Sequence, residues 1–158
     1  MNRPAAAGYS HAQIALHWLT LLLLVGIWLT RGGAERAFDA VREGAAASLP
    51  LHAIIGITIL IVTVIRIALR FMHGAPPPVA TDSAAQQKAT IWGHRLLYLF
   101  LVLVPVGGAM MWFTSSPGPH GLLGYALFIL VLGHAVLALW HHHVKKDGVM
   151  TRMIRPGG

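Results

Sequence analysis

The last long apolar segment of the chain, from His120 to His143, constrains the fold more than any other stretch. It has the length of a helix that crosses a bilayer, and almost nothing between its two ends is charged. Within it, His120 and His134 lie fourteen residues apart. In a helix, fourteen residues return to within about 40° of the same face and rise about 21 Å. Both imidazoles therefore face the same interior, at two depths of a membrane.

The chain contains four apolar segments of this kind. Of its 158 residues, 56% are hydrophobic and only 11% are charged, which is too apolar for an ordinary soluble domain. We predict an all-α fold, an integral membrane four-helix bundle, that forms a single membrane domain over residues 1–158. The predicted helices span about residues 12–30, 49–71, 91–113 and 120–144.

The connections between these segments have the composition of surface structure. Residues 31–48 mix three arginines with three acidic residues and predict an exposed loop or a short amphipathic helix. Residues 73–88 contain three consecutive prolines, which cannot continue a helix. Within the third apolar segment, Pro105, Gly107 and Gly108 indicate a kink or a close contact with a neighbouring helix.

Basic residues indicate the orientation of the bundle. With the N-terminus inside, nine basic residues face the cytoplasm and three face outward, which the positive-inside rule favours. The inner set is Arg3, Arg66, Arg70, Lys88, Arg95, Lys145, Lys146, Arg152 and Arg155, and the outer set is Arg31, Arg36 and Arg42. We therefore expect both termini in the cytoplasm. The net charge of +7 belongs to these loops and to contacts with the lipid bilayer, and no nucleic-acid binding is expected.

The same topology sorts four histidines by depth. His52 and His120 begin segments that enter from outside and form an outer pair, while His17 and His134 form an inner pair. Ionisable side chains inside a bilayer are costly and mark functional sites. Two opposed pairs at two depths are what a four-helix bundle needs to hold two bis-histidine haem b groups. The chain has no cysteine, which excludes thiolate-held clusters and thioether-attached haem.

Further residues on the inner side are secondary candidates. His94, one turn into the third segment, would reach the inner haem or a propionate, and an interfacial anchor is the alternative for it. His141 lies seven residues past His134 on nearly the same face, so it is the rival inner ligand or a proton-handling residue at a quinone site. The basic side chains that would neutralise propionates or snorkel to lipid phosphate are Arg66, Arg70 and Arg95.

Four stretches resemble the bacterial cytochrome b561 family and together cover nearly the whole chain. They are YSHAQIALHWL, LHAIIGITILIVTVIRIALR, GHRLLYLFLVLVPVGGAMMW and HGLLGYALFILVLGHAVLALWHHHVKKDGVMTRM. The resemblance implies that two haem b groups are bound by His17, His52, His120 and His134. It also implies a multi-pass protein of the bacterial inner membrane that passes electrons between ubiquinone, or a similar quinone, and a partner or oxidant. Superoxide oxidation is one activity in that family.

Three functions remain open from the sequence. The first is a quinone-linked oxidoreductase of the superoxide oxidase type, to which the outer arginines would attract an anion, although neighbouring acidic residues largely cancel their charge. The second is a membrane anchor and electron relay for a periplasmic redox enzyme. The third is a histidine-lined transporter of divalent metals. It is disfavoured because all five acidic residues lie outside the apolar segments, whereas cation transport usually needs oxygen ligands.

Overall fold

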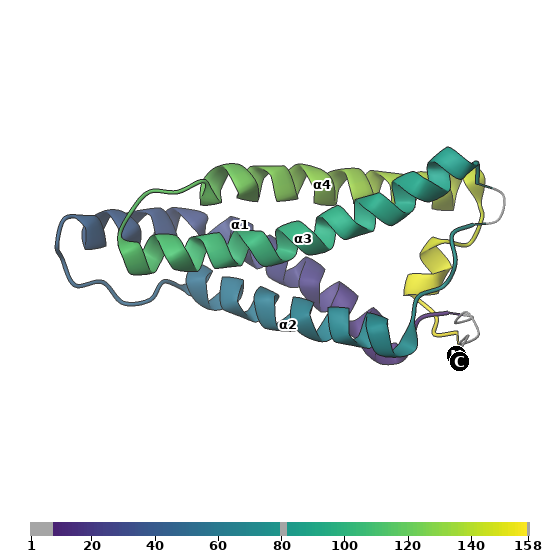
Figure 1. The fold of residues 1–158 in the computed structure, drawn as a ribbon, viewed down its shortest axis with the longest axis horizontal. Coiled ribbons are helices and arrows are strands. Elements are labelled where there is room, and N and C mark those ends of the chain that lie inside the picture. The colour runs from purple at the N-terminus through teal and green to yellow at the C-terminus, as the bar shows by residue number, and fades with distance from the viewer. Residues whose placement is uncertain (1–7, 80–81, 158) are drawn as a thin grey trace.

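The computed structural model describes residues 8–79 and 82–157, and within them the chain forms helices joined by loops, with no strand. Four long helices run alternately up and down an elongated bundle (Figure 1). They are α1 (His11–Arg42), α2 (Leu51–His73), α3 (Ala84–Thr114) and α4 (His120–Trp140). A π-helical turn, His141–Lys145, extends α4, and a short 3₁₀ helix, Met150–Met153, follows. All four long helices are apolar enough to cross a membrane, which confirms the predicted four-helix membrane bundle.

The chain segments before α1 and after α4 meet at one end of the bundle, beside the α2–α3 link (Figure 1). Trp18 Nε1 donates a hydrogen bond of 2.8 Å to the Met153 carbonyl. The Arg152 guanidinium donates one of 2.7 Å to the Pro77 carbonyl in the α2–α3 link. The tail therefore packs against both α1 and this link. Arg3, which counts in the inner basic set, lies outside the described residues.

Two helices are longer than predicted. α1 continues to Arg42, through the stretch expected to be a loop or a short amphipathic helix. Opposite charges spaced four residues apart, as at Arg31 and Glu35, are typical of an exposed helix. α3 begins at Ala84 rather than near residue 91, because Ser83 caps it through a reciprocal pair of hydrogen bonds with the side chain and backbone of the third helical residue.

The buried core is small, and most large apolar side chains face outward. Its buried members are Ile59, Leu101, Val104 and Leu127. By contrast, Leu29 is 77% exposed and Phe113 is 85% exposed. In water this exposure would oppose folding, but lipid tails solvate such side chains as well as a protein interior does. The exposed apolar surface is therefore the surface that faces lipid.

Helices that follow one another in the sequence pack side by side, α1 with α2, α2 with α3 and α3 with α4. Rings bridge the space between α1 and α4. Trp28 of α1 stacks on Phe128 of α4 with ring centres 4.3 Å apart. His17 of α1 faces His134 of α4 with ring centres 6.2 Å apart. The bundle thus places histidine side chains across its interior.

Candidate functional site

At the end of the bundle away from the described termini, His52 and His120 face each other. His52 lies in the first turn of α2, His120 begins α4, and their ring centres are 6.0 Å apart. Nδ1 of His52 lies 3.0 Å from the Ile27 carbonyl oxygen, and Nδ1 of His120 lies 2.9 Å from that of Val104. A carbonyl only accepts, so each Nδ1 carries the hydrogen and each Nε2 keeps its lone pair. Metal-binding histidines commonly donate the hydrogen of their other ring nitrogen to a carbonyl in this way.

At the other end of the membrane-spanning region, three imidazoles gather. His17 of α1 and His134 of α4 have ring centres 6.2 Å apart, and His94 of α3 lies 5.3 Å from His134. Nδ1 of His94 lies 2.7 Å from the Thr90 carbonyl oxygen in its own helix, so its Nε2 also keeps a lone pair. His94 therefore belongs to this cluster and offers His134 a second neighbour.

The half-buried Arg66 reaches the same cluster from α2. Its guanidinium donates to Oγ1 of Thr20 at 3.0 Å and to Nδ1 of His17 at 3.3 Å. Because a guanidinium only donates, Nδ1 accepts here and the hydrogen of neutral His17 lies on Nε2. Binding of a metal by Nε2 of His17 therefore requires Arg66 to leave this nitrogen. The guanidinium is then available to an anionic group nearby.

The other two arginine candidates lie against aromatic rings. The Arg70 guanidinium is 6.0 Å from the centre of the Tyr98 ring, which Arg66 also approaches, at 5.4 Å. Arg95 is exposed and lies 4.8 Å from the centre of the Trp92 ring. Such packing is typical of basic side chains near a membrane interface. Of the three arginines, Arg66 alone donates a hydrogen bond to one of the candidate histidines in the described part of the chain.

His141, the rival inner ligand, has a different partner. Its Nδ1 lies 2.5 Å from Oδ2 of Asp147, in the link that follows the π-helical turn. Its ring packs on Trp140 at 5.2 Å, and it lies seven residues, or about 10 Å of helix, beyond His134. The structure thus places His141 at the end of α4, next to a carboxylate, while His134 lies among the other imidazoles.

Both facing pairs have the separation that a metal between two imidazoles requires. A metal–nitrogen bond is about 2 Å long and the ring centre lies about 1 Å further, so two opposed imidazoles have centres roughly 6 Å apart. The distances of 6.0 Å for His52 and His120 and 6.2 Å for His17 and His134 fit this value. A donor set of neutral imidazoles suits haem iron.

Glycines shape the surroundings of His120. A Cβ added to Gly108 of α3 would lie 2.9 Å from the His120 ring, so the ring rests directly on the backbone of α3. This contact lets the ring reach the Val104 carbonyl, one turn earlier in α3. Gly124, one turn after His120, leaves open space, because a Cβ there would meet nothing within 4 Å. That space is compatible with a flat group beside the histidine.

Several hydrogen-bond partners of the candidate histidines were not predicted from the sequence. Every residue has a carbonyl, so the sequence does not reveal that those of Ile27 and Val104 accept from the histidines. Sequence reasoning also did not single out Asp147 as a partner of His141. A carboxylate six residues after a histidine at a helix end was the available signal.

Comparison with known proteins identifies the family of the chain. The model of the prokaryotic cytochrome b561 family matches residues 8–156. The chain belongs to this family. It is 38% identical to cytochrome b562 of Cereibacter sphaeroides over 94% of this chain and 96% of that protein. It is 29% identical to the probable superoxide oxidase CybB of Yersinia pestis, over 92% and 95%, and 26% identical to cytochrome b561 homolog 2 of Escherichia coli, over 92% and 90%.

Membership confirms the family resemblance found in the sequence and defines the general function. The chain is a multi-pass bacterial membrane protein of the cytochrome b561 family, with a role in electron transfer. The family implies haem b as the cofactor. The facing imidazoles, with their free Nε2 atoms at the His52 and His120 pair and their separations near 6 Å, fit such a group.

Proposed function

We propose that this cytochrome b561-family protein binds two haem b groups and transfers electrons across the bacterial inner membrane between a quinone and an outer donor or acceptor. One haem would lie between His52 and His120, and the other between His17 and His134. The observation that carries the proposal is that each pair faces across the bundle at 6.0 Å or 6.2 Å between ring centres. Bound haem b supplies an iron that gains and loses one electron at a time.

The spacing of the two pairs supports a transmembrane path. His120 and His134 belong to the same helix, and fourteen residues of helix correspond to about 21 Å. One pair therefore lies toward each surface of a bilayer with a core about 30 Å thick. Under the topology that the basic residues favour, with both termini in the cytoplasm, the pair of His52 and His120 is the outer one.

The chain's own groups would tune these sites. The Ile27 and Val104 carbonyls accept from His52 and His120, which holds the rings in place and makes Nε2 a stronger donor to iron. At the inner pair, Arg66 is a half-buried cation without a carboxylate among its described contacts. A buried charge is costly without a counter-charge, so we propose that Arg66 pairs with a haem propionate when His17 binds iron.

For the outer reaction we propose oxidation of superoxide coupled to reduction of quinone. Two superoxide anions each lose one electron and leave as dioxygen, and the quinone takes up two electrons and two protons to become quinol. The similarity to the probable superoxide oxidase of Yersinia pestis supports this choice. So does a cleft of about 460 Å³ between the end of α1 and the start of α2. Its lining includes Arg36, the one charged residue among those that line it, and Leu51, the residue before His52.

The first test measures the haem content and then the reduction of the bound haem by electron donors. We expect the detergent-purified protein to contain two haem b per chain, measured as the pyridine complex and by a reduced-minus-oxidised spectrum. Enzymatically generated superoxide should reduce the bound haem and, with a ubiquinone analogue present, yield quinol. Reduction by quinol together with inertness toward superoxide would contradict the oxidase proposal and favour the membrane anchor and electron relay. One haem or none per chain would contradict the two-haem proposal.

A second prediction follows from the contact between α3 and His120. We expect Gly108→Val to reduce the haem content from two toward one per chain, because the new side chain would occupy the place of the His120 ring. Gly107→Val is the matched control, since a Cβ at Gly107 would meet nothing within 4 Å. Two haem groups per chain in both variants would show that the position of the His120 ring is not needed for haem binding.

A further inference from the structure

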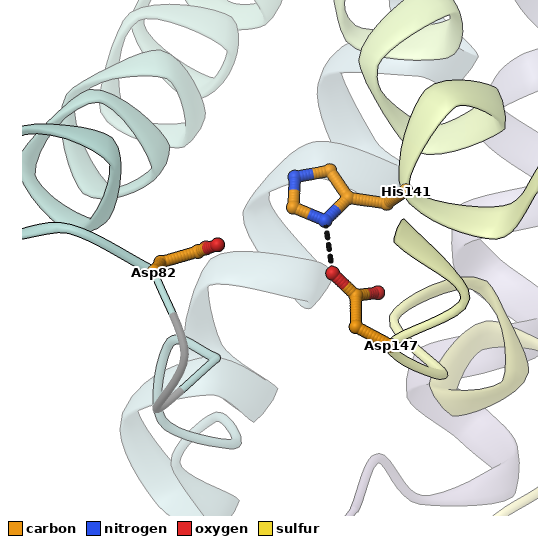
Figure 2. A group of neighbouring side chains, drawn as sticks. All are labelled: Asp82, His141 and Asp147. Atoms are coloured by element: carbon orange, nitrogen blue, oxygen red, sulfur yellow. Dashed lines mark hydrogen bonds and ion pairs between the residues drawn. The ribbon is translucent and has the colours of Figure 1, made fainter. Parts of the chain in front are cut away.

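Beyond the four histidines, a second cluster of ligand-type side chains lies at the end of the bundle where the tail packs. Asp82 precedes α3, His141 begins the π-helical turn after α4, and Asp147 follows that turn. Figure 2 shows the three side chains pointing toward one another from these segments. One ligand atom of each lies within 4.8 Å of the ligand atoms of the other two. The fold thus joins the α2–α3 link to the end of α4 at this point.

The cluster is shielded from solvent and rich in negative charge. Asp82 is 8% exposed, and the side chains of Asp147 and His141 are 8% and 16% exposed. Burial raises the pKa of the Asp147 carboxyl, but the hydrogen bonds from His141 and from the Val149 amide hold it below its ordinary value. Two shielded carboxylates at one point need positive charge to compensate them.

Lys145 supplies part of that charge. Its ammonium donates to Oδ1 of Asp82 and lies 5.4 Å from the centre of the Trp140 ring. The two carboxylates and this ammonium together carry one net negative charge. The cluster therefore already binds one cation in the form of a side chain, and a metal ion would compete with this ammonium for Asp82.

We propose that Asp82, His141 and Asp147 form a binding site for a divalent cation of the Zn²⁺, Co²⁺ or Ni²⁺ class. One imidazole nitrogen and two carboxylate oxygens are a donor set that these ions accept, with water completing the coordination. Bonds of about 2.0–2.2 Å place tetrahedral ligand atoms roughly 3.4 Å apart. The present ligand atoms lie within 4.8 Å of one another, and the hydrogen-bonded atoms of His141 and Asp147 are 2.5 Å apart, so the wider separations would close and this pair would open. The ion displaces the Lys145 ammonium from Asp82, and any ligand proton is released to solvent.

The site differs from the haem positions in place and in consequence. His141 lies about 10 Å of helix beyond His134, so occupancy of the cation site leaves the imidazole cluster in the membrane unchanged. A bound ion would hold the segment between α2 and α3 against the end of α4 and stabilise the packing of the tail. A ligand that binds only the folded state raises the apparent Tm, and the rise grows with the ligand concentration.

The test uses the full-length, untagged, haem-loaded protein in detergent after treatment with a chelator. Isothermal titration with ZnCl₂ at neutral pH should show one site per chain that Asp82→Asn and Asp147→Asn each weaken by about tenfold or more. Lys145→Met should bind Zn²⁺ more tightly than the wild type, because it removes the competing ammonium. Zn²⁺ should also raise the Tm of the wild type, and CoCl₂ provides a spectroscopic check of coordination.

The neighbouring histidines provide the control. His142 and His143 are exposed and follow His141 directly, so a variant with both replaced by Ala should keep the Zn²⁺ site. Loss of binding in that variant and retention in both Asp variants would overturn the proposal in favour of an exposed histidine tract. Weaker binding in Lys145→Met, or no Zn²⁺ binding and no rise in Tm in the wild type, would also overturn it. The reduced haem spectrum should be the same with and without Zn²⁺, which separates this test from that of the proposed function.

Discussion

Replacing His120 with Ala is expected to lower the haem content from two to one per chain. His120 provides one of the two nitrogens at the proposed outer site, and its ring is oriented by α3 through the Val104 carbonyl. Without it, His52 alone would hold the haem at this site, and one nitrogen would bind the group less tightly than two. The pyridine complex, related to protein concentration, gives the number of haem groups directly.

A double variant makes this prediction sharper. If His52 and His120 bind the same haem, His52→Ala and His120→Ala should each leave one haem, and the double variant should leave one as well, because the two residues act as a unit. If they bound different haems, the double variant would lose both. His143→Ala, at an exposed position, is the control and should keep two haem groups.

Replacing His134 with Ala should remove the inner haem, whereas His141→Ala should leave both haem groups bound. The ring centre of His134 lies 6.2 Å from that of His17 and 5.3 Å from that of His94, while Nδ1 of His141 is paired with Asp147. Haem content and the low-spin spectrum of the remaining haem separate the two outcomes. Loss of a haem in His141→Ala with retention in His134→Ala would reverse the assignment.

His94 is the remaining alternative at the inner site. Its ring centre lies 5.3 Å from that of His134, which is shorter than two opposed imidazoles around a metal require. We therefore expect His94→Ala to keep two haem groups and to change mainly the reduction potential of one of them. Loss of a haem in His94→Ala, with two retained in His17→Ala, would make His94 the partner of His134.

Much of the fold follows from the sequence because a bilayer leaves few choices. Each apolar segment must satisfy its backbone hydrogen bonds internally, so four segments of spanning length predict four helices. The ends of two helices were less well predicted. Hydropathy marks where a helix leaves lipid, but α1 continues in an exposed, charged form to Arg42, and α3 begins early at the cap formed by Ser83.

The sequence by itself determined the fold class, because segments of spanning length must be helices in a bilayer, and four of its stretches indicated the family by resemblance. Helical periodicity and membrane thickness also predicted the histidine pairs, with His141 left open as a rival to His134. The tertiary structure decided which groups surround them. It placed the His120 ring on Gly108 and the His94 ring beside that of His134. It also paired Arg66 with His17 and Asp147 with His141. These contacts join residues far apart or at helix ends. They depend on how the helices cross and on where the tail returns, which a pattern along one helix does not contain.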